Sequence, residues 1–406
     1  MPLPAIKKIS VRELRPGMYV HDLDCGWMVH PFLRSRFLVS GEKQIQRIIQ
    51  SGIRELYIDS ARGLDAADAP TRTEVESALE CDVVEAGRSA ATPPRASVDE
   101  EIKRARSVLA EANRAIHTLL QDARLGRRVS VEQTEPVVEK IAESVLRNRG
   151  ALLSLCAIKT KDEYTYLHSV SVCALMMVLC RAVEMDEKSV REAGLGGLLH
   201  DVGKMTTPDA ILNKPGRLTD EEFALMREHV VAGREILEST PGITPVALTV
   251  AAEHHERFDG SGYPHGLKAQ AISPMGQLSA IVDVYDAITS DRVYHKGIPA
   301  PAALRKLLEW SRMHFNPDSV HIFIKAVGIY PTGSLVLLES GRLAVVVDQS
   351  EGSLLEPRVR VVYDTHKASF VQTYDIDLSR GAGGAERILG YEPPGKWSID
   401  PLSYLG

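Results

Sequence analysis

Five histidines and two aspartates in the middle of the chain have side chains that can hold metal ions. Five of the thirteen histidines lie between positions 168 and 255, each inside a dense polar motif. The candidate ligands are His168, His200, Asp201, His229, His254, His255 and Asp283. Imidazoles and carboxylates are ligands of first-row divalent metals, and the lack of clustered cysteines argues against a structural zinc site. A lone histidine is more often an ordinary residue, so the joint pattern carries the prediction.

The number of candidate ligands predicts two metal ions. Seven ligands from five segments exceed the needs of one tetrahedral ion and suit two ions that share a carboxylate. Asp201, directly after His200, is the natural bridge. Two ions roughly 3.5–4 Å apart can activate a bridging water as hydroxide and neutralise phosphoryl oxygens. Lys204 could contact a phosphate oxygen, or could simply be the cation at a helix C-terminus. The set predicts hydrolysis of a phosphoester.

A glycine-rich segment follows two of the ligands. After His254 and His255 the sequence reads ERFDGSGYPHGL, in which residues 259–262 form a flexible turn sequence. Tyr263 then supplies an aromatic ring next to Pro264, whose φ is fixed. By itself such a stretch is an ordinary surface turn, but its position beside two ligands predicts a loop that borders the substrate.

The first hundred residues indicate a small α/β domain and a linker. Strand-like patterns lie at residues 7–11, 18–23 and 54–59, with a helical pattern at 42–50. Between residues 64 and 97 the composition shifts to Ala, Pro, Thr and acidic residues, which predicts a flexible linker. Two helices follow, one over 99–125 and one starting near Ser130 with a sequence that resembles a capping box. They could form a hairpin, a dimer seam or a signalling stalk, or pack on the next domain.

The remainder divides into a helical region and a β-rich region. Residues 150–330 predict five to seven helices, with start signals at Thr219 and Glu222, at Pro245, and at Ser273 before Pro274. After residue 330 a period of two predicts a small antiparallel sheet. The expected fold is mainly α, with an α/β domain (1–65), a linker (66–98), connecting helices (99–148), a helical catalytic domain (149–330) and a carboxy-terminal β-rich extension (331–406).

Composition excludes several functional classes. Lys and Arg total 48 against 54 Asp and Glu, a net charge of −6, and no local basic track predicts binding to a nucleic acid polymer. The five cysteines include no CxxC pair, which suits a reducing compartment. The first residues lack the apolar core of a signal peptide, and the longest apolar run, 172–180, is about half a membrane span. We expect a cytoplasmic protein without membrane insertion.

Two motifs resemble those of the HD-GYP proteins, a bacterial branch of the HD phosphohydrolase superfamily. Residues 200–204, HDVGK, match the HDxGK motif, and residues 254–264 match HHExxDGxGYP. The similarity extends through KPGRLTDEE, DVYDAITS and DRVYHK and covers roughly residues 150–330. Residues 5–65 also resemble the small domain of unknown function that often precedes HD-GYP domains. The resemblance implies an all-helical HD-superfamily catalytic domain.

The resemblance also implies an activity and roles for individual residues. The activity is hydrolysis of the bacterial second messenger cyclic di-GMP to pGpG and often on to GMP, with two divalent ions, most often iron and also manganese. His168, His200, Asp201 and Asp283 would hold one ion, and Asp201, His229, His254 and His255 the other. Lys204, Tyr263 and Arg292 match substrate contacts, and Asp201 and Lys204 are the catalytic candidates.

Two positions depart from the family pattern. A glutamate that binds a third metal in some members is replaced by Tyr164, with Glu163 one step away, so two metals are expected. The family's Arg-x-Tyr-Lys pattern reads Arg292-Val293-Tyr294-His295 here, with Lys296 shifted by one. This change predicts a lost or replaced phosphate contact and a reduced affinity or rate.

Two other functions compete with the phosphodiesterase. The first is an adaptor that binds the nucleotide or a diguanylate cyclase (GGDEF) partner through the loop around Tyr263, without useful turnover. The second is an HD phosphohydrolase for another nucleotide, such as a deoxynucleotide or an alarmone, against which the 259–264 signature argues. A homodimer is a further expectation that the sequence leaves open.

Overall fold

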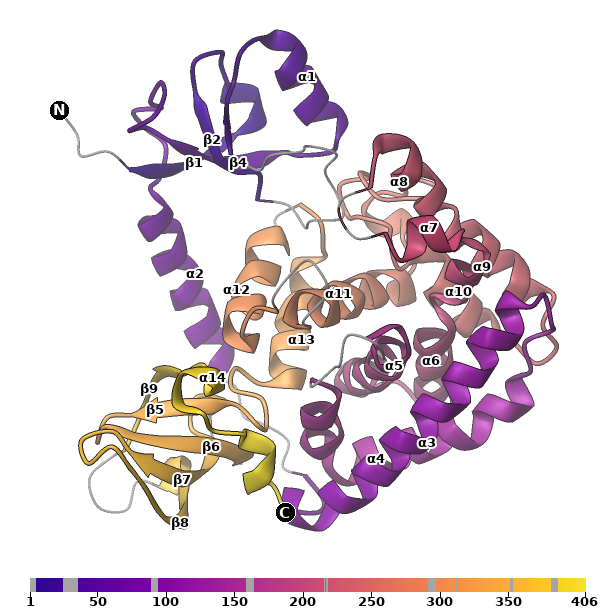
Figure 1. The fold of residues 1–406 in the computed structure, drawn as a ribbon, viewed down its shortest axis with the longest axis vertical. Helices are drawn as coiled ribbons and strands as arrows, with labels where there is room; N and C mark the ends of the chain where they lie inside the picture. Colours follow the sequence, from indigo (N-terminus) through magenta and orange to yellow (C-terminus); the bar gives the residue numbers. More distant parts are fainter. Residues whose placement is uncertain are drawn as a thin grey trace. The chain divides into compact units, whose positions relative to one another are not determined.

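The computed structural model describes ten stretches of the chain, which are residues 5–24, 36–88, 94–157, 164–214, 216, 218–290, 297–311, 313–350, 353–380 and 386–406. They form two compact units (Figure 1). Unit 1 comprises Met1–Asp82 and Lys214–Ala224, and unit 2 comprises Val83–Asn213 and Leu225–Gly406. All seven candidate ligands belong to unit 2.

The amino-terminal part of unit 1 is a four-stranded antiparallel sheet with one helix. The strands are β1 (Ile6–Ser10), β2 (Tyr19–Asp22), β3 (Phe37–Leu38) and β4 (Glu55–Asp59), in the order β1-β4-β2-β3, and the helix is α1 (Glu42–Gln50). Val20, Ile48, Leu56 and Ile58 are fully buried between sheet and helix. The predicted α/β unit is confirmed. The sequence pattern missed β3 because two residues are too short to show a period.

The predicted linker contains a regular helix. Helix α2 spans Arg72–Gly87, so the expectation of a flexible segment is wrong for these residues. Thr71 Oγ1 accepts from the backbone N–H of Glu74, and the Glu74 carboxylate accepts from the Thr71 N–H. This capping box starts the helix and was hidden by the Ala, Pro and Thr content of the region.

Two long helices begin the main part of unit 2. Helix α3 (Val98–Arg124) and helix α4 (Val131–Cys156) pack against each other, and both also contact helix α5. Two of the predicted alternatives for these helices, a hairpin and packing on the next domain, are therefore both confirmed. Ser97, with Glu100, provides the capping box of α3, whereas Ser130 makes no capping bond, so that predicted capping box is wrong. The backbone of α4 breaks at Asn148, whose φ of −154° and ψ of 100° are not helical.

The helical core carries more helices than the predicted five to seven. In the described part of 150–330 these are α5 (Tyr164–Ala182), α6 (Glu187–Leu199), α7 (Asp209–Leu212), α8 (Asp220–Arg227), α9 (His229–Glu238), α10 (Pro245–Glu253), α11 (Pro274–Thr289), α12 (Ala300–Ser311) and α13 (Pro317–Val327). The predicted starts at Thr219, Pro245 and Ser273 are confirmed by their capping contacts. The count differs because short helices such as α7 and the break before His229 divide the chain further.

Helix α5 is the core of the helical region. Its Thr165–Ala182 window could cross a membrane by length and composition, but 78% of that window is buried inside the protein. Helices α4, α6, α11 and α13 all pack against it. An apolar helix surrounded on all sides is expected in the centre of a helical domain.

The carboxy-terminal region forms the predicted antiparallel sheet. Its strands are β5 (Leu335–Leu338), β6 (Arg342–Asp348), β7 (Arg358–Asp364), β8 (Ser369–Asp377) and β9 (Ile388–Tyr391), in the order β8-β7-β6-β5-β9. Val336, Ala344, Val346 and Val359 are fully buried in its apolar cluster. The sequence pattern predicted the first four strands and missed β9, which pairs with β5 at the sheet edge.

Candidate metal centre

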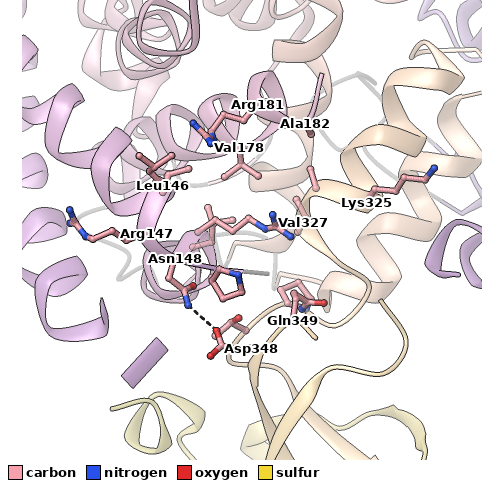
Figure 2. Close-up of a pocket in the computed structure, with 18 of the residues that line it drawn as sticks. Leu146, Arg147, Asn148, Val178, Arg181, Ala182, Lys325, Val327, Asp348 and Gln349 are labelled. Carbon is pink, nitrogen blue, oxygen red and sulfur yellow. Dashed lines mark hydrogen bonds between the residues drawn. The ribbon is translucent and has the colours of Figure 1, made fainter. Parts of the chain in front are cut away.

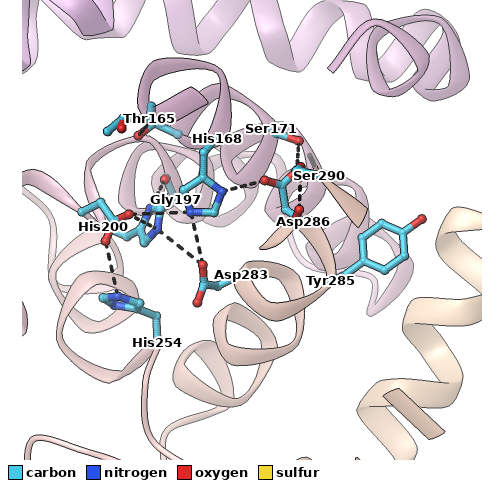
Figure 3. Close-up of polar contacts among 12 residues, drawn as sticks. Thr165, His168, Ser171, Gly197, His200, His254, Asp283, Tyr285, Asp286 and Ser290 are labelled. Atoms are coloured by element: carbon cyan, nitrogen blue, oxygen red, sulfur yellow. Dashed lines mark hydrogen bonds and ion pairs between the residues drawn. The ribbon is translucent and has the colours of Figure 1, made fainter. Parts of the chain in front are cut away.

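The seven predicted ligands converge because most of them lie at or near helix ends. His200 and Asp201 directly follow α6, and His229 is the first residue of α9. His254 and His255 directly follow α10. The remaining two, His168 on α5 and Asp283 on α11, come from within helices (Figure 3). All seven side chains are buried.

Asp201 lies in the middle of this cluster. Its Oδ2 is 3.3 Å from His200 Nε2 and 3.6 Å from His168 Nε2. Its Oδ1 is 3.5 Å from His229 Nε2 and 3.9 Å from His254 Nε2. Each oxygen of one carboxylate thus faces a different pair of imidazoles, which is the arrangement required of a bridging ligand.

The ligand atoms fall into two separate groups. His168, His200 and Asp283 form one, and His229, His254 and His255 form the other, with ligand atoms within 4.8 Å of one another in each group. Asp283 Oδ1 is 3.2 Å from His168 Nε2, and its Oδ2 is 3.7 Å from His255 Nδ1. A third group at the same spacing, His200, Asp201 and His254, connects the two. The assignment of the ligands to two ions, which the family resemblance implies, stays a prediction.

Hydrogen bonds orient the imidazoles toward the centre. The Nδ1 atoms of His200, His229 and His254 lie 2.8, 2.6 and 2.8 Å from the backbone oxygens of Gly197, Met226 and Ala251, respectively. A carbonyl oxygen only accepts, so each Nδ1 carries the proton and each Nε2 keeps its lone pair. His168 Nδ1 is 2.6 Å from the carboxylate of Asp286, which leaves its Nε2 for the centre in the same way.

Five buried polar atoms of this cluster have no hydrogen-bond partner among the described residues. They are Nε2 of His200, His229 and His254, Oδ1 of Asp201 and Oδ2 of Asp283. Buried polar atoms are normally satisfied, and unsatisfied ones carry a desolvation cost. Because these atoms are lone-pair donors that face one another, the residues fit a divalent metal pair.

Electrostatics keep most of the ligands in their metal-binding forms. Burial lowers the pKa of His229 to about 4 and the pKa of His254 to about 3. Burial by itself would raise the pKa of Asp201, but His200 and Lys204 hold that pKa well below its ordinary value. His200 is the exception, because the Asp201 carboxylate raises its pKa although burial opposes this. His229 and His254 are therefore neutral and Asp201 is ionised at neutral pH.

Comparison with known proteins shows the family of this chain. The HD domain profile matches residues 137–318, and a domain of unknown function, DUF3391, matches residues 6–134. The cyclic di-GMP phosphodiesterase PA4108 of Pseudomonas aeruginosa is 45% identical over 98% of this chain and 95% of its own length. The chain belongs to the HD-GYP family.

Shorter similarities cover the catalytic region of this HD-GYP protein. A cyclic di-GMP phosphodiesterase of Thermotoga maritima is 39% identical over 41% of this chain and 45% of its own. The 3'3'-cGAMP-specific phosphodiesterase 1 of Vibrio cholerae is 37% identical over 36% of this chain and 33% of its own. Relatives of the HD-GYP region therefore include enzymes named for two different cyclic dinucleotides.

Lys204 of the HD-GYP motif lies beside the predicted bridge. Its Nζ donates to Asp201 Oδ2 at 2.5 Å, and 22% of its side chain is exposed. The residue belongs to a short 3₁₀ segment, Val202–Thr206, which follows the ligand pair. The ammonium is thus at the edge of the centre, between the buried carboxylate and solvent, where a phosphate group could reach it.

Gly203 allows this segment to approach helix α9 closely. A Cβ at position 203 would lie 1.9 Å from the backbone oxygen of His229 and 2.4 Å from the backbone nitrogen of Gly233. Any larger residue would therefore collide with backbone atoms that cannot move independently of His229. The glycine fixes the separation between Asp201 and His229.

The loop after His255 is held in place by its own polar contacts. The buried carboxylate of Glu256 accepts from the backbone N–H groups of His265 and Leu267, both at 2.9 Å. The Tyr263 ring centroid is 4.6 Å from that of His255, and the Arg227 guanidinium lies 4.3 Å from the Tyr263 ring. The turn that the sequence predicts to be flexible is therefore held by hydrogen bonds to Glu256 and lies beside the centre.

Some predicted positions lie outside the described residues. They include Arg292, the third substrate-contact candidate, together with His295 and Lys296 of the altered family pattern. Glu163 and the side chain of Tyr164 also lie outside them, so the expectation about a third metal stays a prediction.

Sequence reasoning missed the residues that support the ligands. Asp286 contacts His168 and accepts from the Ser171 hydroxyl, and Arg227 stacks on Tyr263 (Figure 3 shows the Asp286 contacts). Asp286 lies three residues after Asp283 and therefore on the same face of α11. That spacing was the available signal for Asp286, whereas nothing in the sequence connects Arg227 with Tyr263.

Proposed function

We propose that the chain hydrolyses cyclic di-GMP to pGpG, with GMP as a further product, in a centre of two divalent metal ions. The observation that carries the proposal is the position of Asp201 between two separate ligand groups. Two ions bridged by a carboxylate are typical of phosphoester hydrolysis. The similarity along nearly the whole length to a protein named cyclic di-GMP phosphodiesterase supports the substrate.

The two ions would share Asp201, and their other ligands would be separate. His168, His200, Asp201 and Asp283 would hold one, and Asp201, His229, His254 and His255 would hold the other. A bound pair supplies Lewis acidity toward phosphoryl oxygens and makes water more acidic. Iron is the proposed metal, with manganese as the other candidate, because imidazole and carboxylate suit both.

The chain's own residues would bind and orient the phosphodiester. In the reaction the water oxygen bonds to one phosphorus, the bond from that phosphorus to a 3′ oxygen breaks, and the 3′ oxygen takes up a proton. The Lys204 ammonium donates to the Asp201 carboxylate in this structure. When Asp201 serves as a metal ligand, the Lys204 ammonium can donate to a phosphoryl oxygen instead. Tyr263, supported by Arg227, offers an aromatic surface to a guanine base next to the centre.

The test is direct measurement of turnover. Purified protein loaded with iron or manganese is incubated anaerobically with cyclic di-GMP, and substrate, pGpG and GMP are resolved by chromatography over time. We expect product formation that Asp201→Ala abolishes together with much of the bound metal. Asp318→Ala is the matched control, since Asp318 is an exposed carboxylate on α13, and it should keep full activity.

Other outcomes would assign the site differently. Full turnover in Asp201→Ala would show that the ligand assignment is wrong. Faster hydrolysis of 3'3'-cGAMP in a parallel assay would move the substrate to the second cyclic dinucleotide for which relatives are named. Tight binding of cyclic di-GMP by fully metal-loaded protein without turnover would favour an adaptor.

We infer a cytoplasmic location, since the substrate is an intracellular second messenger. GGDEF-domain diguanylate cyclases are the proposed protein partners, and a homodimer is the proposed assembly. Size-exclusion chromatography with light scattering would measure the mass of the particle, alone and with a purified GGDEF domain. A monomer that fails to co-elute with that domain would contradict both proposals.

A further inference from the structure

Unit 2 contains a cavity at the C-terminal end of helix α5. Its volume is about 540 Å³, and its walls come from α4, α5, α13, the residues before α3 and the end of β6 (Figure 2). The lining includes Val178 and Arg181 near the end of α5, and Asp348 and Gln349 at the end of β6. Cavities of this size hold ligands of about the size of a nucleotide.

The cavity is distinct from the metal centre. Helix α5 contributes His168 to the centre and Arg181 to the cavity. At 1.5 Å per residue, thirteen residues of α-helix separate the two positions by about 20 Å along the axis. None of the seven ligands lines the cavity.

Arg149 is one of the charged residues that line this cavity. It is half-buried, and among the described residues no carboxylate forms an ion pair with its guanidinium. Burial without a partner lowers the pKa of Arg149 below its ordinary value. A guanidinium withdrawn from water is normally paired, and its five donors match the oxygens of a phosphate. Arg149 is therefore a cation that can gain an anionic partner.

The break in α4 places Arg149 at this position. Asn148, where the backbone leaves the helical conformation, donates to Asp348 Oδ1 at 2.8 Å and to the backbone oxygen of Ala96 at 2.9 Å. The same Asp348 accepts from the Val98 N–H at 3.2 Å. These bonds fix the break on two sides, and Arg149 is the next residue.

The other charges around the cavity are mainly positive. Arg95, Arg181 and Lys325 are exposed lining residues without an ion pair among the described residues. Arg147 is already neutralised by Glu101, at 2.7 Å, and by a bond to Glu143. Asp348 is the one carboxylate among the described lining residues, and it is engaged by its two donors. The excess of cations favours an anion.

We propose that this cavity binds a phosphate ester of nucleotide size, with its phosphate on Arg149 and its remainder against the apolar wall formed by Val178 and Val327. The exposed cations would add to the attraction at the rim. Val145, Leu153 and Ile322 extend the apolar lining, so the cavity has a surface for a base or another uncharged group as well as for a phosphate. This site goes beyond the proposed function and does not depend on it.

The test compares two arginine variants of the full-length, metal-loaded protein. Equilibrium dialysis with GMP gives the number of molecules bound per chain, and we expect Arg149→Gln to lower that number by one. Arg106→Gln is the matched control, because Arg106 is an exposed arginine on α3 without an ion pair among the described residues. It should bind as the unaltered protein does, and Arg149→Lys should retain part of the binding.

Controls separate the cavity from the metal centre and define the ligand. Arg149→Gln should leave turnover and the unliganded melting temperature unchanged while losing the rise in melting temperature that GMP produces. Equal GMP stoichiometry in Arg149→Gln and Arg106→Gln would overturn the proposal. Equal binding of guanosine would refute the role of the phosphate, and inorganic phosphate binding as tightly as GMP would refute recognition of nucleotide size.

Discussion

The metal centre and the Arg149 cavity draw on the same helix, α5, but offer opposite charge to a ligand. Five imidazoles and two carboxylates form the centre, all buried and largely directed at one another. In the cavity a half-buried arginine is joined by exposed cations. A dehydrated, oriented site binds a metal tightly, whereas a partly hydrated one gives weaker and more salt-sensitive attraction. One domain can thus separate cation binding from anion binding.

The largest expected effect comes from removing a ligand of the centre. His200→Ala should abolish turnover and much of the bound metal, because the Nε2 of this residue faces both Asp201 and Asp283. Metal analysis and the chromatographic assay measure the two losses. His321→Ala, which alters an exposed histidine on α13, should change neither. Retained metal in His200→Ala would mean that the buried cluster is not the binding site.

A smaller effect is expected from Asp286, which supports a ligand without belonging to either group. Asp286→Asn should weaken metal binding by about 10–100-fold, because the amide holds His168 less firmly than a carboxylate does. Competition with a metallochromic chelator gives the affinity. Asp318→Asn provides the exposed control. An unchanged metal affinity in Asp286→Asn would show that the contact between Asp286 and His168 does not support metal binding.

Acid should destabilise the metal-free chain. The folded state keeps His254 neutral down to about pH 3 and His229 down to about pH 4, because burial lowers each pKa. The unfolded chain binds those protons below about pH 6.5, so stability falls as the pH decreases from 6.5 toward 4. Each residue contributes a slope of up to about 1.4 kcal/mol per pH unit. The raised pKa of His200 works in the opposite direction.

Urea unfolding of chelator-treated protein at several pH values measures this slope. His254→Gln should flatten it, because the variant lacks one of the groups that the folded state keeps neutral. A stability that rises on acidification from pH 6.5 would contradict the assignment of neutral histidines. The cavity should not add to this slope, because its cations keep their charge throughout this range, and the pKa of Asp348, which burial raises, works in the opposite direction.

The smallest effect is expected at the rim of the cavity. Arg181 is exposed, so Arg181→Gln should weaken GMP binding by about two- to fivefold, since exposed ion pairs contribute about 0.2–1 kcal/mol. The more buried Arg149 should matter more. Isothermal titration at two salt concentrations measures both variants. A larger loss for Arg181→Gln than for Arg149→Gln would place the phosphate outside the cavity.

The two regions also differ in how far the sequence predicts them. The ligand residues can be predicted from the sequence because metal binding needs particular side chains. Four of them also form two adjacent pairs, His200-Asp201 and His254-His255. The helix starts at Pro245 and Ser273 were equally visible, since caps are local. The cavity has no such signal. Arg149, Arg181 and Lys325 belong to three helices, and only tertiary packing brings them together.

The errors of the sequence prediction also show the difference between local signals and contacts made by tertiary packing. Helix α2 was taken for a linker because composition outweighed the Thr71 and Glu74 capping pair. The support of Tyr263 by Arg227 was invisible, because that contact joins residues 36 positions apart on different elements. Local chemistry is thus readable from the chain, and contacts between distant segments are not.

Gly203 has a consequence for recognising inactive family members by sequence. A chain can keep every metal ligand and still lose the centre if a larger residue stands at this position, because its Cβ would meet the His229 backbone. The presence of the histidines and aspartates alone is therefore not sufficient evidence of an intact centre. The glycine of the HDxGK motif is therefore a further criterion, and its physical reason is the close approach of this segment to the backbone of α9.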